Sequence, residues 1–106
     1  MSKCKAVALV EGANYCISRC TGCGRFGIYY KNVLIGFSQR DFMNFSKRYC
    51  EIEFHDHVML FPDMVERVLI KTPHPEIQLN LDYHEFEELG DILQQCGLIL
   101  EARALV

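Results

Sequence analysis

The residues whose spacing most clearly suggests a chemical function are cysteines near the start of the chain. Three of the six cysteines form a C-x3-C-x2-C pattern, made by Cys16, Cys20 and Cys23. Two thiolates separated by two residues can reach one tetrahedral metal ion from a tight turn. Gly22 and Gly24 would let backbone N–H groups approach the sulfurs, because glycine has no Cβ. The pattern therefore predicts a zinc knuckle at Cys20 and Cys23, with Cys16 as a third ligand.

A closed tetrahedral site also needs a fourth ligand, and the sequence does not choose one. The chain has no second C-x-x-C, so the other half of a zinc ribbon is missing. The candidates for the fourth ligand are Cys4, Cys50, His55 and His57.

Other interpretations of the same cysteines stay open. Cys20 and Cys23 could exchange electrons as a thiol–disulfide pair, but such a pair usually begins a helix, whereas a strand is expected here. The spacing also matches the iron–sulfur motif of radical-SAM enzymes, for which this chain is too short and lacks a glycine-rich cofactor segment. Finally, the thiols could simply pack as small apolar side chains.

The histidines offer a second possible site. If residues 51–60 form one strand, Glu51, Glu53, His55 and His57 share a face, because strand side chains alternate. Such a face could chelate a metal or could simply be solvated. The sequence has no nucleophile elbow, phosphate loop or dinucleotide fingerprint, so no catalytic residues are assigned and an enzyme is not favoured.

The elements that would position these residues alternate between strand-like and helix-like patterns. We expect strands at 5–10, 15–17, 26–30, 33–37, 67–71, 77–81 and 98–100. Helices are expected at about 39–49 and 83–96, the second closed by Gly97 in a left-handed conformation.

Two segments share one design, in which a strand leads through a helix cap into an amphipathic helix. Ser38 and Asp82 are the expected N-caps, each followed three residues later by an acidic residue. The pattern predicts two pseudo-repeated β-hairpin–helix units at about 26–50 and 67–96. We therefore expect an α+β fold with two helices packed on a mostly antiparallel sheet.

Length and charge narrow the classes of function. The 106 residues fit a single domain, 1–106, and a net charge of −3 argues against nucleic acid as a partner. The sequence has neither an apolar run of the roughly 20 residues that span a membrane nor a signal-peptide core. We expect a cytoplasmic protein, in which clustered cysteines suggest metal or redox chemistry more than disulfides.

The order of motifs resembles a family of small, uncharacterised bacterial proteins, a domain of unknown function. The resemblance rests on the Cys20–Cys23 knuckle, a hairpin with Asn32, the segment Val68-Leu-Ile-Lys-Thr-Pro and the two strand–helix units. It covers most of the chain, from about Tyr15 to Cys96, and implies no activity.

The leading hypothesis for function is a small non-enzymatic binding domain. Its partner would be another protein or a second copy of the chain, bound through exposed strand edges. The first alternative is a structural zinc-binding domain that uses Cys20 and Cys23 with Cys16. A thiol-redox protein is the weaker alternative.

Overall fold

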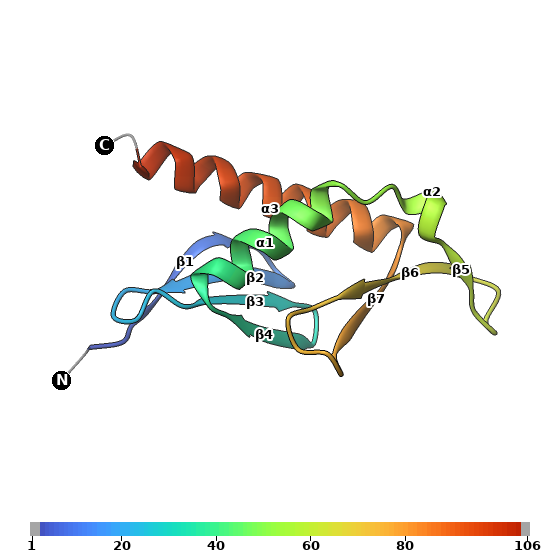
Figure 1. The fold of residues 1–106 in the computed structure, drawn as a ribbon, viewed down its shortest axis with the longest axis horizontal. Coiled ribbons are helices and arrows are strands. Elements are labelled where there is room, and N and C mark those ends of the chain that lie inside the picture. The colour runs from blue at the N-terminus through green and yellow to red at the C-terminus, as the bar shows by residue number, and fades with distance from the viewer. Residues whose placement is uncertain (1–2, 105–106) are drawn as a thin grey trace.

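The computed structural model describes residues 3–104 and contains two antiparallel sheets under a layer of helices (Figure 1). The first sheet is a meander in which each strand pairs with the next. Its strands are β1 (Ala6–Glu11), β2 (Tyr15–Cys20), β3 (Phe26–Tyr30) and β4 (Val33–Phe37). Alternation places Ile17, Ile28 and Ile35 in register on neighbouring strands, and all three are buried.

The second sheet has the order β5 (Met59–Leu60), β6 (Glu66–Lys71) and β7 (Gln78–Asp82). Val68 and Ile70 on β6 alternate with exposed residues and lie opposite Leu81 and Leu79 of β7. These four side chains are buried, so the sheet contributes one apolar face to the core.

The two long helices, α1 (Gln39–Cys50) and α3 (Tyr83–Ala104), lie on one side of the strands (Figure 1). α1 begins as expected, because the Ser38 hydroxyl oxygen accepts a hydrogen bond from the Asp41 N–H at 3.1 Å. Its apolar stripe buries Phe42, Phe45 and Tyr49.

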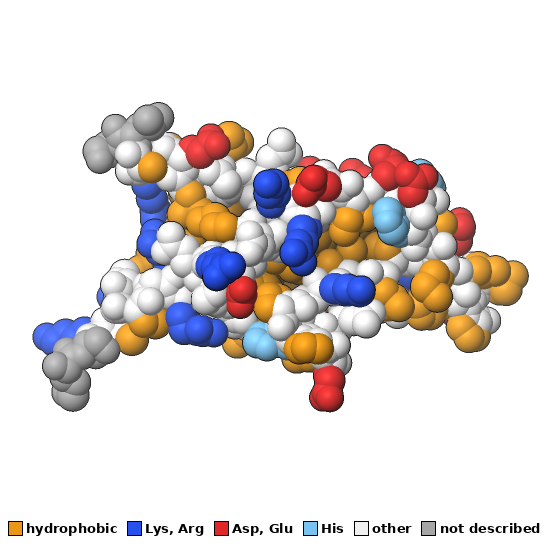
Figure 2. Space-filling model, viewed as in Figure 1, with side chains coloured by type: hydrophobic (Ala, Val, Ile, Leu, Met, Phe, Trp, Pro, Cys, Tyr) orange, Lys and Arg blue, Asp and Glu red, His pale blue; other side chains and the backbone are white. Residues whose placement is uncertain are grey.

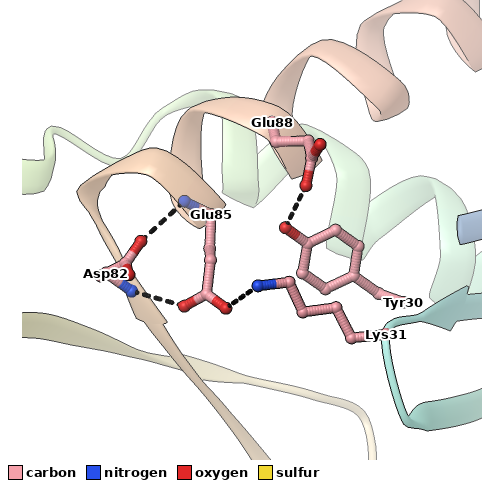
Figure 3. Close-up of polar contacts among 5 residues, drawn as sticks. All are labelled: Tyr30, Lys31, Asp82, Glu85 and Glu88. Atoms are coloured by element: carbon pink, nitrogen blue, oxygen red, sulfur yellow. Dashed lines mark hydrogen bonds and ion pairs between the residues drawn. The ribbon is translucent and has the colours of Figure 1, made fainter. Parts of the chain in front are cut away.

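α3 begins with a reciprocal capping box and is tied to the first sheet beside it (Figure 3). The Glu85 N–H donates to the Asp82 carboxylate at 2.8 Å, and the Asp82 N–H donates to the Glu85 carboxylate at 3.0 Å. The Tyr30 hydroxyl donates to Glu88 and the Lys31 ammonium donates to Glu85, both at 2.5 Å. The second hairpin–helix unit is thus joined to the first by polar contacts as well as by the core.

Aromatic side chains fill the space between helices and sheets. Phe26 of β3 stacks on Phe42 of α1 with ring centroids 4.3 Å apart. Tyr49 of α1 stacks on Phe86 of α3, and its hydroxyl donates to the Phe86 carbonyl at 2.8 Å. Burial raises the pKa of Tyr49 well above its ordinary value. The buried apolar residues form one continuous cluster under both helices.

The predicted α+β class and both hairpin–helix units are confirmed, although the strands divide into two sheets instead of one. The expected helix end at Gly97 and the strand at 98–100 are wrong, because α3 continues to Ala104. A glycine inside a helix costs about 1 kcal/mol. Packing of Ile99 and Leu100 against the core offsets that cost.

The segment 51–60 is not one strand. Residues Phe54–His57 form the short helix α2, with Phe54 buried against Phe86 and Tyr83. The predicted strand face with Glu51, Glu53, His55 and His57 is therefore wrong, because residues 54–57 are helical. None of the helices in residues 3–104 combines the length and apolar character that crossing a bilayer requires.

Candidate metal centre

Three cysteines from two separate segments meet at the end of the first sheet. The sulfur atoms of Cys4, Cys20 and Cys23 all lie within 4.8 Å of one another. Cys20 is the last residue of β2, Cys23 lies in the turn between β2 and β3, and Cys4 precedes β1. The site lies at the surface, because Cys4 and Cys23 are exposed and Cys20 is half-buried.

Backbone hydrogen bonds build the turn that holds Cys20 and Cys23. The Cys20 N–H donates to the Arg25 carbonyl at 2.8 Å, and the Gly24 N–H donates to the Cys20 carbonyl at 2.9 Å. Gly24 has φ +75°, a left-handed conformation that glycine adopts without steric cost. The turn therefore brings the second cysteine back towards the first.

The segment before β1 is fixed against this turn. The Thr21 N–H donates to the Lys5 carbonyl at 3.0 Å, and the Thr21 hydroxyl approaches the same oxygen at 3.3 Å. A Cβ on Gly22 would lie 2.9 Å from the Lys3 carbonyl oxygen and 3.0 Å from the Cys4 Cα and Sγ. Only glycine at position 22 lets Cys4 come this close without a backbone shift.

The Cys20 sulfur is surrounded by hydrogen-bond donors. Backbone and side-chain hydrogen bonds from Cys23 contribute most, with further donation from the Gly22 N–H and the Cys4 thiol. Because donors stabilise the thiolate, the pKa of Cys20 is lowered from its ordinary 9.0 to about 6. Near neutral pH Cys20 is mostly thiolate, which is the form that binds metals.

The geometry and chemistry of the cluster fit zinc. With Zn–S bonds of about 2.3 Å, the sulfurs of a tetrahedral site are about 3.8 Å apart. The present separations lie within 4.8 Å, so none exceeds that value by more than about 1 Å. All three potential ligands are sulfur atoms, which zinc prefers in structural sites, and they lie at the surface.

The structure brings together two of the three residues in the predicted knuckle and adds Cys4. Cys16 lies near the start of β2, opposite Glu11 on β1 and Tyr29 on β3. Cys20 follows it four positions later, about 13 Å along the strand. Burial and the nearby Glu11 carboxylate raise the pKa of the Cys16 thiol, the opposite of the shift at Cys20.

The other candidates for the fourth ligand lie elsewhere. Cys50 is at the C-terminal end of α1, and His55 and His57 belong to α2, at the opposite end of the molecule from the β2–β3 turn (Figure 1). The His55 ring stacks on Tyr83, and His57 Nδ1 lies 3.1 Å from the Glu53 carbonyl oxygen. Within residues 3–104, no fourth histidine, cysteine or carboxylate joins the three sulfurs.

The position of Cys4 was encoded in strand register. Ala6 pairs with Cys20 in the antiparallel β1–β2 hairpin, so the chain two residues before Ala6 lies beside the chain two residues after Cys20. The sequence pattern predicts a strand that ends at residue 17, whereas β2 continues to Cys20. The bulge between Ala8 and Val10, which shifts the register by one residue, has no signal in that pattern either.

The fold and the site define a small α+β domain in which three cysteines, close enough to bind a metal ion, lie at one end of the first sheet. The chain belongs to the family of unknown function DUF6686, whose model matches residues 1–98. No curated protein and no solved structure matches the chain in sequence or fold comparisons.

Proposed function

We propose that the protein is a small zinc-binding interaction domain, with one Zn²⁺ held by Cys4, Cys20 and Cys23. The observation that carries the proposal is the meeting of three sulfurs from two chain segments within 4.8 Å. The metal would join the segment before β1 to the β2–β3 turn. Bound zinc would therefore contribute to folding energy, as structural zinc sites do.

The fourth coordination position would be taken by water in the isolated chain. Three protein ligands at an exposed site leave that position accessible, and a partner protein could fill it with its own side chain. Zinc binding by thiolates requires reduced cysteines, so the proposal carries with it a reducing compartment such as the cytoplasm.

The lowered pKa of Cys20 also favours a second candidate, thiol–disulfide exchange between Cys20 and Cys23. The surrounding structure supports zinc more strongly. A redox pair needs only two sulfurs, whereas here glycine at position 22 admits a third sulfur from another segment. The pair also lies in a hairpin turn and not at the start of a helix.

Cobalt substitution distinguishes the two candidates. Co²⁺ added to the reduced, metal-free protein should give one equivalent of a tetrahedral complex with strong thiolate-to-metal charge-transfer absorption, displaced by Zn²⁺. Cys4→Ser should lose part of the charge-transfer intensity and bind more weakly. Absence of saturable cobalt binding, together with ready formation of a Cys20–Cys23 disulfide, would favour the redox candidate instead.

A further inference from the structure

A cavity of about 430 Å³ lies between α1 and β6, far from the cysteine cluster. Phe45, Tyr49 and Ile52 from the α1 side and Ile70 from β6 give it apolar walls. In Figure 2 this face shows an apolar hollow with lysine and arginine side chains spread around it. A mainly apolar cavity of this size with a few charged groups at its rim is typical of a ligand site.

The cavity is bordered by a strand edge. Leu69, Ile70 and Lys71 are consecutive residues of β6, and all three line it. Because side chains of a strand alternate between faces, three successive residues reach one cavity only when the backbone edge itself borders it.

That edge has no strand partner in the described part of the chain. β5 pairs only with Glu66 and Arg67, while β7 covers the other side of β6. Met59 lies opposite Arg67, so a longer β5 would have placed residues 55–58 beside 68–71. The chain instead turns into α2 at Phe54–His57, which leaves the position beside 68–71 to the cavity.

The charges around the cavity favour an anion. Arg48 of α1 and Lys71 of β6 line it from opposite sides, and neither makes an ion pair with a carboxylate of residues 3–104. His57 also lines the cavity, and its Nδ1 lies 3.1 Å from the Glu53 carbonyl oxygen, which leaves Nε2 for a ligand. The only carboxylate in the lining, Asp41, lies two helical turns, about 10 Å, before Arg48.

We propose that this groove binds an extended peptide segment with acidic side chains, which adds to the free edge of β6 as a further strand. Main-chain hydrogen bonds to 68–71 would supply affinity, as in other cases of strand addition. Alternate side chains would enter the apolar groove, and carboxylates would meet Arg48 and Lys71. The peptide site is separate from the zinc site, so either proposal can fail without the other.

The test is an NMR titration of the full-length, ¹⁵N-labelled protein with the peptide Ac-Glu-Val-Glu-Val-Glu. Two matched peptides separate the contributions: one has Gln in place of Glu with an amidated end, and the other is N-methylated at every residue, because the N–H groups of alternate strand residues point to opposite sides. We expect saturable amide shifts centred on residues 69–71 and on α1 near Arg48. Loss of main-chain hydrogen bonds should weaken the N-methylated peptide about tenfold.

Protein variants test the charges. Arg48→Gln with Lys71→Gln should weaken binding of the acidic peptide about threefold to tenfold, as expected for exposed ion pairs. The control is Lys47→Gln, because Lys47 is the exposed neighbour of Arg48 and does not line the cavity. It should leave the affinity unchanged.

Several results would overturn the proposal. Equal binding of plain and N-methylated peptides would show that the β6 edge is not used. Equal binding of the Glu and Gln peptides would show that the peptide carboxylates do not contribute to affinity. Shifts of 68–71 that depend on protein concentration without peptide would identify a second copy of the chain as the occupant. If millimolar peptide causes no saturable amide shifts, the groove does not bind an acidic extended peptide.

Discussion

At the scale of single residues, the surroundings of the sulfur atom distinguish Cys20 from Cys16 and Cys96. Donors lower the pKa of Cys20 to about 6, whereas burial raises the pKa of Cys96 and, with Glu11, that of Cys16. A low pKa and two neighbouring sulfurs mark Cys20 as the sulfur most ready to bind a metal. The proposed zinc-binding function therefore depends on the three-cysteine cluster.

The Cys20 pKa predicts a pH dependence in the metal-free, reduced protein. Alkylation of Cys20 by iodoacetamide, followed by peptide mass spectrometry, should show a midpoint near pH 6. Because the folded-state pKa lies below the ordinary 9.0, the thiolate stabilises the fold. That stabilisation is complete above pH 9, declines as the pH falls towards 6 and is absent at lower pH.

The stability difference between wild type and Cys20→Ser should follow the same course. It should grow between pH 6 and 9 in urea unfolding, while Cys16→Ser should show no such growth, because the pKa of Cys16 is raised. A Cys20 alkylation midpoint near pH 9 would contradict the donor geometry.

Gly22 provides a second prediction at this scale. A Cβ there would lie 2.9 Å from the Lys3 carbonyl oxygen, so Gly22→Ala should push the Cys4 segment away from the turn. We expect zinc affinity to fall about tenfold or more, the effect typical of changes just outside the ligand shell. Competition with a chromophoric chelator measures this affinity. Gly97→Ala, at a helical glycine with open space around it, should leave zinc affinity unchanged.

At the scale of elements, local sequence signals specified most of the fold. The Ser38 and Asp82 caps and the two hairpin–helix units follow from short-range chemistry, and both caps form as expected. The wrong predictions concern segments whose secondary structure depends on long-range packing. α3 passes through Gly97 because its next turn packs on the core, and Phe54 begins a short helix because its ring is buried among aromatic neighbours.

The site was predicted in part for the same reason. Two residues separate Cys20 from Cys23, and this C-x-x-C spacing is visible in the sequence. Cys4 is brought in only by the pairing of β1 with β2, a contact over more than a dozen residues with a bulge in its register. The β6 edge likewise depends on where β5 stops, which no periodicity in the sequence reveals.

The capping box of α3 can be tested directly. Asp82→Ala removes the acceptor for the Glu85 N–H and should lower the free energy of unfolding by about 1 kcal/mol. Chemical denaturation followed by circular dichroism measures the change. Asp91→Ala replaces an exposed aspartate inside the same helix and should not destabilise the protein. Equal losses in the two variants would assign the effect to charge and not to the cap.

At the scale of the whole molecule, α3 joins the two sheets. It contacts β1 in the first sheet and β6 and β7 in the second, and the buried residues form one cluster. This arrangement predicts that residues 3–104 unfold as a single cooperative unit.

A substitution at Leu93, which is 1% exposed on the buried face of α3, tests whether the two sheets unfold together. Leu93→Ala should cost about 2–5 kcal/mol and lower hydrogen-exchange protection in both sheets together. Leu98→Ala, at a residue that is 62% exposed on the same helix, should change stability by less than about 0.5 kcal/mol. Loss of protection in only one sheet would show that the two sheets unfold separately.

The most direct test of the central claim is the zinc content of protein purified without a metal-affinity tag, measured by elemental mass spectrometry. We predict one zinc per chain in the wild type and in Cys16→Ser, and little or none in Cys4→Ser. Zinc in Cys4→Ser but not in Cys16→Ser would contradict the three-cysteine centre, as would a wild-type protein that binds no zinc after reconstitution under reducing conditions.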